Sequence, residues 1–107
     1  KRIIAVGGAS VFRELDDLPP YLLNVAAEHR RQWEYLKTSH KDWTLVCPVF
    51  FSDDLSDSRY RVAREALPEG SESVMMHDIA EFIVDELERG EYTNARVGIV
   101  SDVVAES

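Results

Sequence analysis

The residue types in this chain that could support catalysis are a cysteine, three histidines and a group of aspartates. Cys47 closes an apolar run, where a thiol could be redox-active or inert. Because burial raises the pKa of a thiol and suppresses the reactive thiolate, we interpret Cys47 as an inert core residue. His77 and Asp78 resemble a catalytic pair. Neighbouring side chains rarely point together, however, and Asp78 with Glu81 three residues later has the pattern of a helix-capping box. The sequence therefore predicts a structural cap at Asp78.

The pattern of these residues predicts no metal site. The histidines, His29, His40 and His77, lack the spacing of zinc ligands. Asp53-Asp54 and Asp57 offer oxygen atoms to a hard cation. Serines surround them, and we interpret this segment as a solvated loop.

Two apolar runs indicate where a ligand would bind. The stretch from Asp42 to Pro48 has the continuous apolar character of a strand covered on both faces, and Pro48 ends it. An earlier run, Ile3 to Val6, ends at Gly7-Gly8, where the absence of side chains allows a ligand to approach the backbone. In open parallel sheets, ligands bind beyond the carboxyl ends of strands. We therefore expect ligand contacts just after both strands.

The elements that position these ends form a strand–helix–strand unit. After an irregular loop from Val11 to Leu18, Pro19-Pro20 opens a helix that we expect to end near Ser39. One apolar stripe follows it at helical spacing. Its members are Leu22, Val25, Ala26, His29, Trp33 and Leu36. Without further information, His29 on this stripe is a satisfied core histidine.

The second half of the chain predicts a hairpin, a helix and a last strand. Residues 58–63 and 73–76 form extended segments that could pair across the turn at residues 68–70, after a loop over residues 50–58. A helix follows from Asp78 to Gly90, a residue that commonly ends helices. Its predicted buried face comprises Ile79, Ala80, Ile83, Val84 and Leu87. Residues 96–100 predict the final strand.

Composition excludes several classes of protein. The net charge of −8 argues against a nucleic-acid surface, which needs clustered cations. The local basic group Arg30, Arg31, Lys37 and Lys41 favours a solvated helix face over an anion site. A single cysteine fits a reducing compartment, and we expect a cytoplasmic protein. No run approaches the roughly 20 apolar residues of a membrane span, and no signal peptide is visible.

The number of elements indicates a partial domain. Three strands covered on both faces need more than two principal helices, and the sheet would present unpaired edges. The chain also lacks an initiator Met and enters a buried strand at once. We therefore expect residues 1–107 to form a single partial domain, with its N-terminal half absent and its sheet edges able to pair with another chain.

The order of several short motifs resembles a known family. They are Ile3-Ile4-Ala5-Val6-Gly7-Gly8, Leu18-Pro19-Pro20, His29, Asp42 to Pro48, Tyr60-Arg61 and His77-Asp78-Ile79-Ala80. This order resembles the C-terminal half of atypical short-chain dehydrogenase/reductase proteins, which bind NAD(P)H and include the NmrA-like regulators, with greatest similarity to the flavin reductases (biliverdin-IXβ reductases). The resemblance implies an α/β fold, the C-terminal part of a Rossmann-type parallel sheet, whose absent N-terminal half carries the glycine-rich phosphate loop.

The resemblance also implies the nicotinamide end of an NAD(P)H site. Val6, Gly7 and Gly8 would lie beside the ribose and nicotinamide, with His29 pointing to the same region. Pro48, Val49 and Phe50 would meet the carboxamide. This sequence departs from the flavin reductases near Gly8 and at Phe50, where they carry a serine and a histidine; Ser10 is a nearby replacement for the serine.

The catalytic residues stay unassigned. The Tyr-x-x-x-Lys pair of typical dehydrogenases is absent, because Val25 follows Tyr21 and Ser39 follows Tyr35 at that spacing. The leading hypothesis is half of an NAD(P)H-dependent reductase, inactive alone, that passes hydride to a small acceptor such as a flavin or quinone. The alternatives are a non-enzymatic NAD(P)-sensing regulator and a structural fragment that pairs its sheet edges with another chain.

Overall fold

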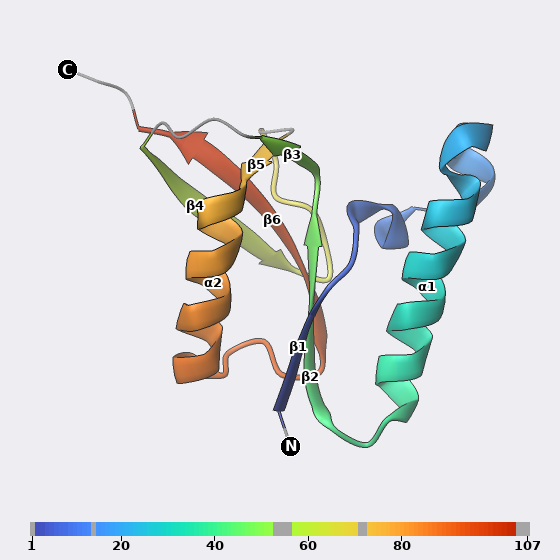
Figure 1. Ribbon diagram of the computed structural model, residues 1–107, viewed down its shortest axis with the longest axis horizontal. Coiled ribbons are helices and arrows are strands. Elements are labelled where there is room, and N and C mark those ends of the chain that lie inside the picture. The colour runs from blue at the N-terminus through green and yellow to red at the C-terminus, as the bar shows by residue number, and fades with distance from the viewer. Residues whose placement is uncertain (1, 14, 53–56, 71–72, 105–107) are drawn as a thin grey trace.

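A four-stranded sheet lies between two helices in the computed structural model, which describes residues 2–13, 15–52, 57–70 and 73–104 (Figure 1). The strand order is β1-β2-β6-β4, and β3 and β5 form a separate two-stranded sheet. In chain order the elements are β1 (Arg2–Val6), α1 (Leu23–Thr38), β2 (Asp42–Pro48), β3 (Phe50–Ser52), β4 (Ser58–Arg64), β5 (Ser73–Met75), α2 (Met76–Arg89) and β6 (Ala95–Val103).

The centre of the main sheet is parallel. β1 pairs with β2, with Val6 opposite Val46, and β2 pairs with β6, with Pro48 opposite Ile99. The carboxyl ends of β1 and β2 therefore lie at the same edge of the sheet, as the sequence predicted. Figure 1 shows the small β3–β5 sheet at this edge.

Strand β2 is covered on both faces. Leu45 and Cys47 belong to an apolar cluster on the α1 side, together with Leu36. Val46 belongs to a second cluster on the α2 side, together with Phe82. Because successive strand residues point to opposite faces, this arrangement explains the continuous apolar run, and the prediction of a buried strand is confirmed.

The predicted hairpin between residues 58–63 and 73–76 is wrong. β4 pairs antiparallel with β6 along a ladder from Ser58↔Val103 to Arg64↔Val97. β5 pairs in parallel with β3, inside the segment that we expected to be a loop. The partner of β4, which is β6, and the partner of β5, which is β3, both lie more than 20 residues away in sequence. The turn signal at residues 68–70 is local and could not identify either partner.

The predicted capping box at Asp78 is also wrong. Helix α2 begins at Met76, its N-cap is Met75, and no side chain caps it. Asp78 lies inside the first turn, fully buried, and accepts hydrogen bonds from Ser58 and Ser101. The carboxylate therefore ties the helix to β4 and β6 rather than satisfying the helix N–H groups.

The buried face of α2 differs from the apolar stripe predicted for it. The buried residues are Asp78, Ile79, Phe82 and Glu86, while Ala80, Val84 and Leu87 are exposed. Asp78 and Glu86 lie on the inner face because hydrogen-bond donors surround their carboxylates there. Hydrophobic periodicity considers only apolar residues and cannot predict such buried acids.

The segment between β1 and α1 contains short 3₁₀ turns. The segment predicted as an irregular loop, Val11 to Leu18, includes 3₁₀ turns at Ala9–Phe12 (η1) and Leu15–Asp17. Pro20–Leu22 forms another 3₁₀ turn that runs into α1, so the predicted helix entry at Pro19-Pro20 is confirmed. Among the described residues, no helix has the length and apolar character needed to cross a membrane.

Candidate functional site

The turn after β1 brings the backbone close to its neighbours. The Gly7 N–H donates to the Val46 carbonyl at 2.8 Å, and the Gln32 amide donates to the Val6 carbonyl at 3.3 Å. A Cβ on Gly7 would lie 3.0 Å from Gln32 Oε1 and 3.2 Å from Leu45 Cδ1. Gly7 therefore allows the chain to leave β1 in direct contact with β2 and α1.

Gly8 lies directly against the ring of His29. A Cβ on Gly8 would stand 2.5 Å from His29 Nδ1 and Cε1, much closer than real contacts allow. The half-buried His29 also places Nδ1 3.4 Å from the Ser10 hydroxyl. The glycine, the serine and the histidine thus form one polar corner at the carboxyl end of β1.

The carboxyl end of β2 adds apolar surface at the same edge. Pro48 is buried, Val49 packs against the α2-side cluster, and Phe50 is 76% exposed. Phe51, next in the chain, is also exposed. Six of the seven residues predicted for a cofactor site therefore lie at or just after the carboxyl ends of β1 and β2, and the seventh, His29, lies on α1 against Gly8. Their contact with a cofactor stays a prediction.

His77 and Asp78 approach each other more closely than expected of neighbours. His77 Nδ1 lies 3.4 Å from Asp78 Oδ1, and His77 Nε2 lies 3.3 Å from the Ser58 hydroxyl oxygen. Ser58 donates its proton to Asp78 Oδ2 at 2.5 Å. A serine nucleophile needs its proton directed at the histidine, so this cluster has the residues of a catalytic triad without its proton geometry.

The same cluster has a structural role that the sequence did not reveal. Ser101 donates to Asp78 Oδ2 at 2.6 Å and accepts the Met75 N–H at 2.8 Å. Ser58, Asp78 and Ser101 come from three elements about 20 residues apart in sequence, so no local spacing indicated the contact. It joins β4, α2 and β6.

Cys47 is buried beneath α1, and burial raises the pKa of its thiol to about 12. The interpretation of Cys47 as a core residue is confirmed, and its lack of reactivity stays a prediction. No group of three metal-ligating side chains occurs within the described ranges. Asp53 and Asp54 lie outside those ranges, and Asp57 is exposed.

Comparison with known proteins gives the family. The sequence profile of a family described as NAD(P)H-binding matches residues 1–89. This chain therefore belongs to the NAD(P)H-binding family, and its cofactor class is NAD(P)H. None of the curated proteins matches it significantly.

Solved structures give the fold. The chain is 26% identical to a proposed NADH-flavin reductase from Streptococcus pneumoniae TIGR4, with a TM-score of 0.82 over 94% of this chain and 56% of that protein. A proposed NAD-dependent epimerase/dehydratase from Bacillus halodurans is 21% identical, with a TM-score of 0.81 over 94% of this chain and 46% of that one. A short-chain dehydrogenase/reductase from Veillonella parvula DSM 2008, solved with NADP, is 19% identical. Its TM-score is 0.65 over 91% of this chain and 49% of that protein.

These similarities confirm the Rossmann-type α/β fold, and the family match gives NAD(P)H binding. The chain spans about half of the length of the solved structures it matches.

Proposed function

We propose that this chain supplies the nicotinamide side of an NAD(P)H site in a reductase of the flavin-reductase-like group. The observation that carries the proposal is the polar corner of Gly8, Ser10 and His29 at the carboxyl end of β1, with the exposed Phe50 following the adjacent strand β2. It lies beyond the carboxyl ends of two adjacent parallel strands, the general ligand position in open α/β sheets.

The residues at this edge fit a flat ring and its polar substituent. Gly8 has no Cβ, which lets the His29 ring lie directly on the backbone at the end of β1, so the half-buried imidazole supplies the polar group at this edge. The Phe50 ring offers an exposed apolar face. When bound, the cofactor supplies a hydride, and the chain's part is to orient the donor and exclude water.

His29 is the group at this corner that can hold a proton. Its Nδ1 faces the Ser10 hydroxyl, which fixes the ring without a carboxylate partner. With no Tyr-x-x-x-Lys pair in the sequence, an acceptor that takes its proton from solvent or from His29 suits the site best. Flavins and quinones are such acceptors.

The cofactor phosphates need groups that this sequence lacks. No G-x-G-x-x-G segment occurs in residues 1–107, and that loop at a helix N-terminus is the usual anchor for the pyrophosphate. The proposal therefore assigns the chain half of a domain, completed by residues outside this sequence, and expects weak binding and no turnover from the half alone.

The test is NADPH titration of the longer protein carrying His29→Ala or Phe50→Ala. The matched controls are His40→Ala and Phe51→Ala, which change an exposed residue of the same type outside the predicted set. We expect both site variants to weaken NADPH binding or turnover about fivefold or more, an energy of about 1 kcal/mol, while the controls stay within twofold. Unchanged binding and turnover in both site variants would remove the assignment.

A non-enzymatic NAD(P)-sensing regulator of the NmrA-like type is the second candidate. The missing Tyr/Lys pair, together with Phe50 where the flavin reductases carry histidine, favours it. The measurement that separates the two is oxidation of bound NADPH by FMN and by a quinone. Absence of oxidation by either acceptor supports the regulator, and turnover supports the reductase.

Pairing of sheet edges with another chain is the third candidate. β1 is an edge strand of the described sheet and has a paired neighbour on one side only. Exposed edges of this kind recruit further strands. Sedimentation of the 107-residue chain tests the idea, because a well-folded monomer at high concentration would contradict it.

A further inference from the structure

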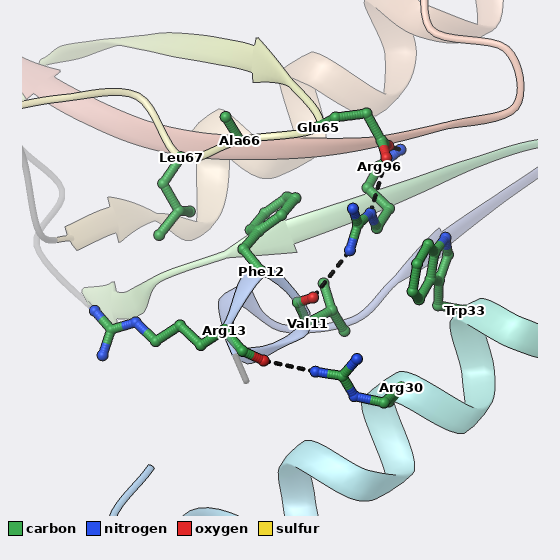
Figure 2. Close-up of a pocket in the computed structure, with 9 residues that line it drawn as sticks. All are labelled: Val11, Phe12, Arg13, Arg30, Trp33, Glu65, Ala66, Leu67 and Arg96. Atoms are coloured by element: carbon green, nitrogen blue, oxygen red, sulfur yellow. Dashed lines mark hydrogen bonds and ion pairs between the residues drawn. The ribbon is translucent and has the colours of Figure 1, made fainter. Parts of the chain in front are cut away.

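A cavity lies on the α1 side of the sheet, among residues that the proposed cofactor site does not use. Its volume is about 520 Å³, and it opens between η1, α1 and the segment that follows β4. Figure 2 shows three arginines around it, Arg13, Arg30 and Arg96, with Phe12 and Trp33. Among the described residues of the lining, Glu65 carries the one carboxylate.

Arg96 is fixed in place by four contacts. Its guanidinium carbon lies 3.9 Å from the Trp33 ring centre and 5.0 Å from that of Phe12. Its Nε donates to Glu65 at 3.0 Å, and Nη1 donates to the Val11 carbonyl at 2.9 Å. The remaining N–H groups of this held guanidinium are available without further loss of side-chain entropy.

The other two arginines of the lining have no ion-pair partner among the described residues. Arg30 Nη2 donates to the Arg13 carbonyl at 2.6 Å, but neither Arg13 nor Arg30 forms an ion pair with a carboxylate of the described residues. The neighbouring Arg31, on the same helix, pairs with Glu28 at 2.9 Å. The chain as a whole is acidic, with a net charge of −8. Positive charge is therefore concentrated at this cavity although acids outnumber basic residues in the sequence.

Arg30 also carries an electrostatic cost. The side chain is turned inward, and its Nε is buried with no hydrogen-bond acceptor in the described structure. The predicted solvated face is confirmed for Arg31, Lys37 and Lys41, which are exposed, and holds only in part for Arg30, which is half-buried and donates to the Arg13 carbonyl. An anion beside this guanidinium would lower the cost of keeping it half-buried.

One wall of the cavity is held by unusual backbone. Glu65 adopts a left-handed conformation with φ of 57°, and its N–H donates to the Arg96 carbonyl at 2.7 Å. Ala66 then lies directly on β6, because a Cβ on Gly98 would stand 2.2 Å from the Ala66 carbonyl oxygen. Strain held by surrounding contacts is typical of binding sites.

We propose that this cavity binds a small organic anion, with its carboxylate or phosphate at Arg30 and the free edge of Arg96. Planar guanidinium forks match both anionic groups. Phe12 and Leu67 offer apolar contact to the body of the ligand, and the volume suits a small molecule. Arg13 extends away from the other two arginines (Figure 2) and attracts the ligand at longer range.

The test is titration of the longer protein with benzoate, phenyl phosphate and inorganic phosphate, without NADPH. Trp33 fluorescence and calorimetry report binding, and Trp43 is buried away from the cavity lining. We expect saturable binding of at least one organic anion below about 10 mM, with inorganic phosphate weaker because it lacks an apolar body. Equal affinities for all three compounds would show that the cavity recognises only the anionic group, and would overturn the proposal of an organic ligand.

Variants identify the residues responsible. Arg30→Gln should weaken binding about tenfold, the usual effect of losing a charged hydrogen-bond donor, and Arg30→Lys should restore part of it. Arg31→Gln is the matched control and should change affinity less than twofold. Circular dichroism checks the fold, and the exposed Arg13→Gln serves as a second variant that lowers the salt dependence. No saturable binding in the unmodified chain, or equal effects of Arg30→Gln and Arg31→Gln, would overturn the proposal.

Discussion

Replacing Glu86 with alanine is expected to remove a large part of the free energy of unfolding. The residue is 2% exposed, although it carries a carboxylate. It accepts hydrogen bonds from Arg2, from the Thr44 hydroxyl at 3.3 Å, and from the N–H groups of Glu91 and Tyr92 at 3.1 and 2.9 Å. One side chain thus joins the end of α2 to β1 and β2.

The magnitude follows from the groups left behind. Arg2 loses its ion-pair partner, and removing one member of a buried pair costs about 3–5 kcal/mol. The Arg2 side chain is 24% exposed, so water relieves part of this cost. The half-buried Tyr92 N–H loses its acceptor, which adds about 1–3 kcal/mol. A loss of about 3–5 kcal/mol is expected, against a total of about 5–15 kcal/mol for a domain of this size.

The assay is urea denaturation followed by circular dichroism, with Glu88→Ala as the matched control. Glu88 lies on the same helix, is exposed, and gives the same change in helix propensity. Its replacement should change stability by less than about 0.5 kcal/mol. A loss below about 1 kcal/mol for Glu86→Ala would refute the reasoning, because the buried carboxylate would then contribute no more than a surface acid.

Three further predictions follow from burial and packing. Because burial raises the Cys47 pKa to about 12, a thiol reagent should label the protein at pH 8 only after denaturation, and rapid labelling of the native chain would contradict this. Gly98→Ala places a methyl 2.2 Å from the Ala66 carbonyl oxygen and should cost about 1–3 kcal/mol; an unchanged melting temperature would show that the segment after β4 moves freely. Burial and the hydrogen bond to Asp85 raise the pKa of Tyr60, so the folded chain keeps this proton longer than the unfolded chain, and stability should fall as pH rises above about 10. Urea denaturation of Tyr60→Phe should show a shallower fall over that range, and an equal slope would exclude Tyr60 as the cause.

Hydrophobic pattern was sufficient for the parts of the fold that local sequence controls. The strand from Asp42 to Pro48 was predictable because burial on both faces leaves a continuous apolar run. The helix after Pro19-Pro20 was predictable from its entry signal and periodicity. Because both strands that flank it are parallel, their carboxyl ends had to share one edge, so the positions of Gly8 and Phe50 followed as well.

The errors came from residues whose partners are distant in sequence. Asp78 has the local pattern of a cap, yet Ser58 and Ser101 supply its hydrogen bonds from two other elements. β4 has the pattern of a hairpin strand, yet it pairs with β6. Arg30 has the pattern of a solvated helix residue, yet it is half-buried and donates to the carbonyl of Arg13, which follows η1. In each case, a long-range hydrogen bond outweighed the local preference.

The sequence by itself determined the parallel strand–helix–strand core and the edge of the sheet where the carboxyl ends of its strands meet, because periodicity and chain breaks are local properties. Only the tertiary structure decided how the polar groups are used. Burial of Glu86, contact between Gly8 and His29, and the gathering of three arginines around one cavity all depend on which elements become neighbours. A buried charge or a missing Cβ acquires its effect from the atoms that surround it, and in a sheet of this topology those atoms come from distant parts of the chain.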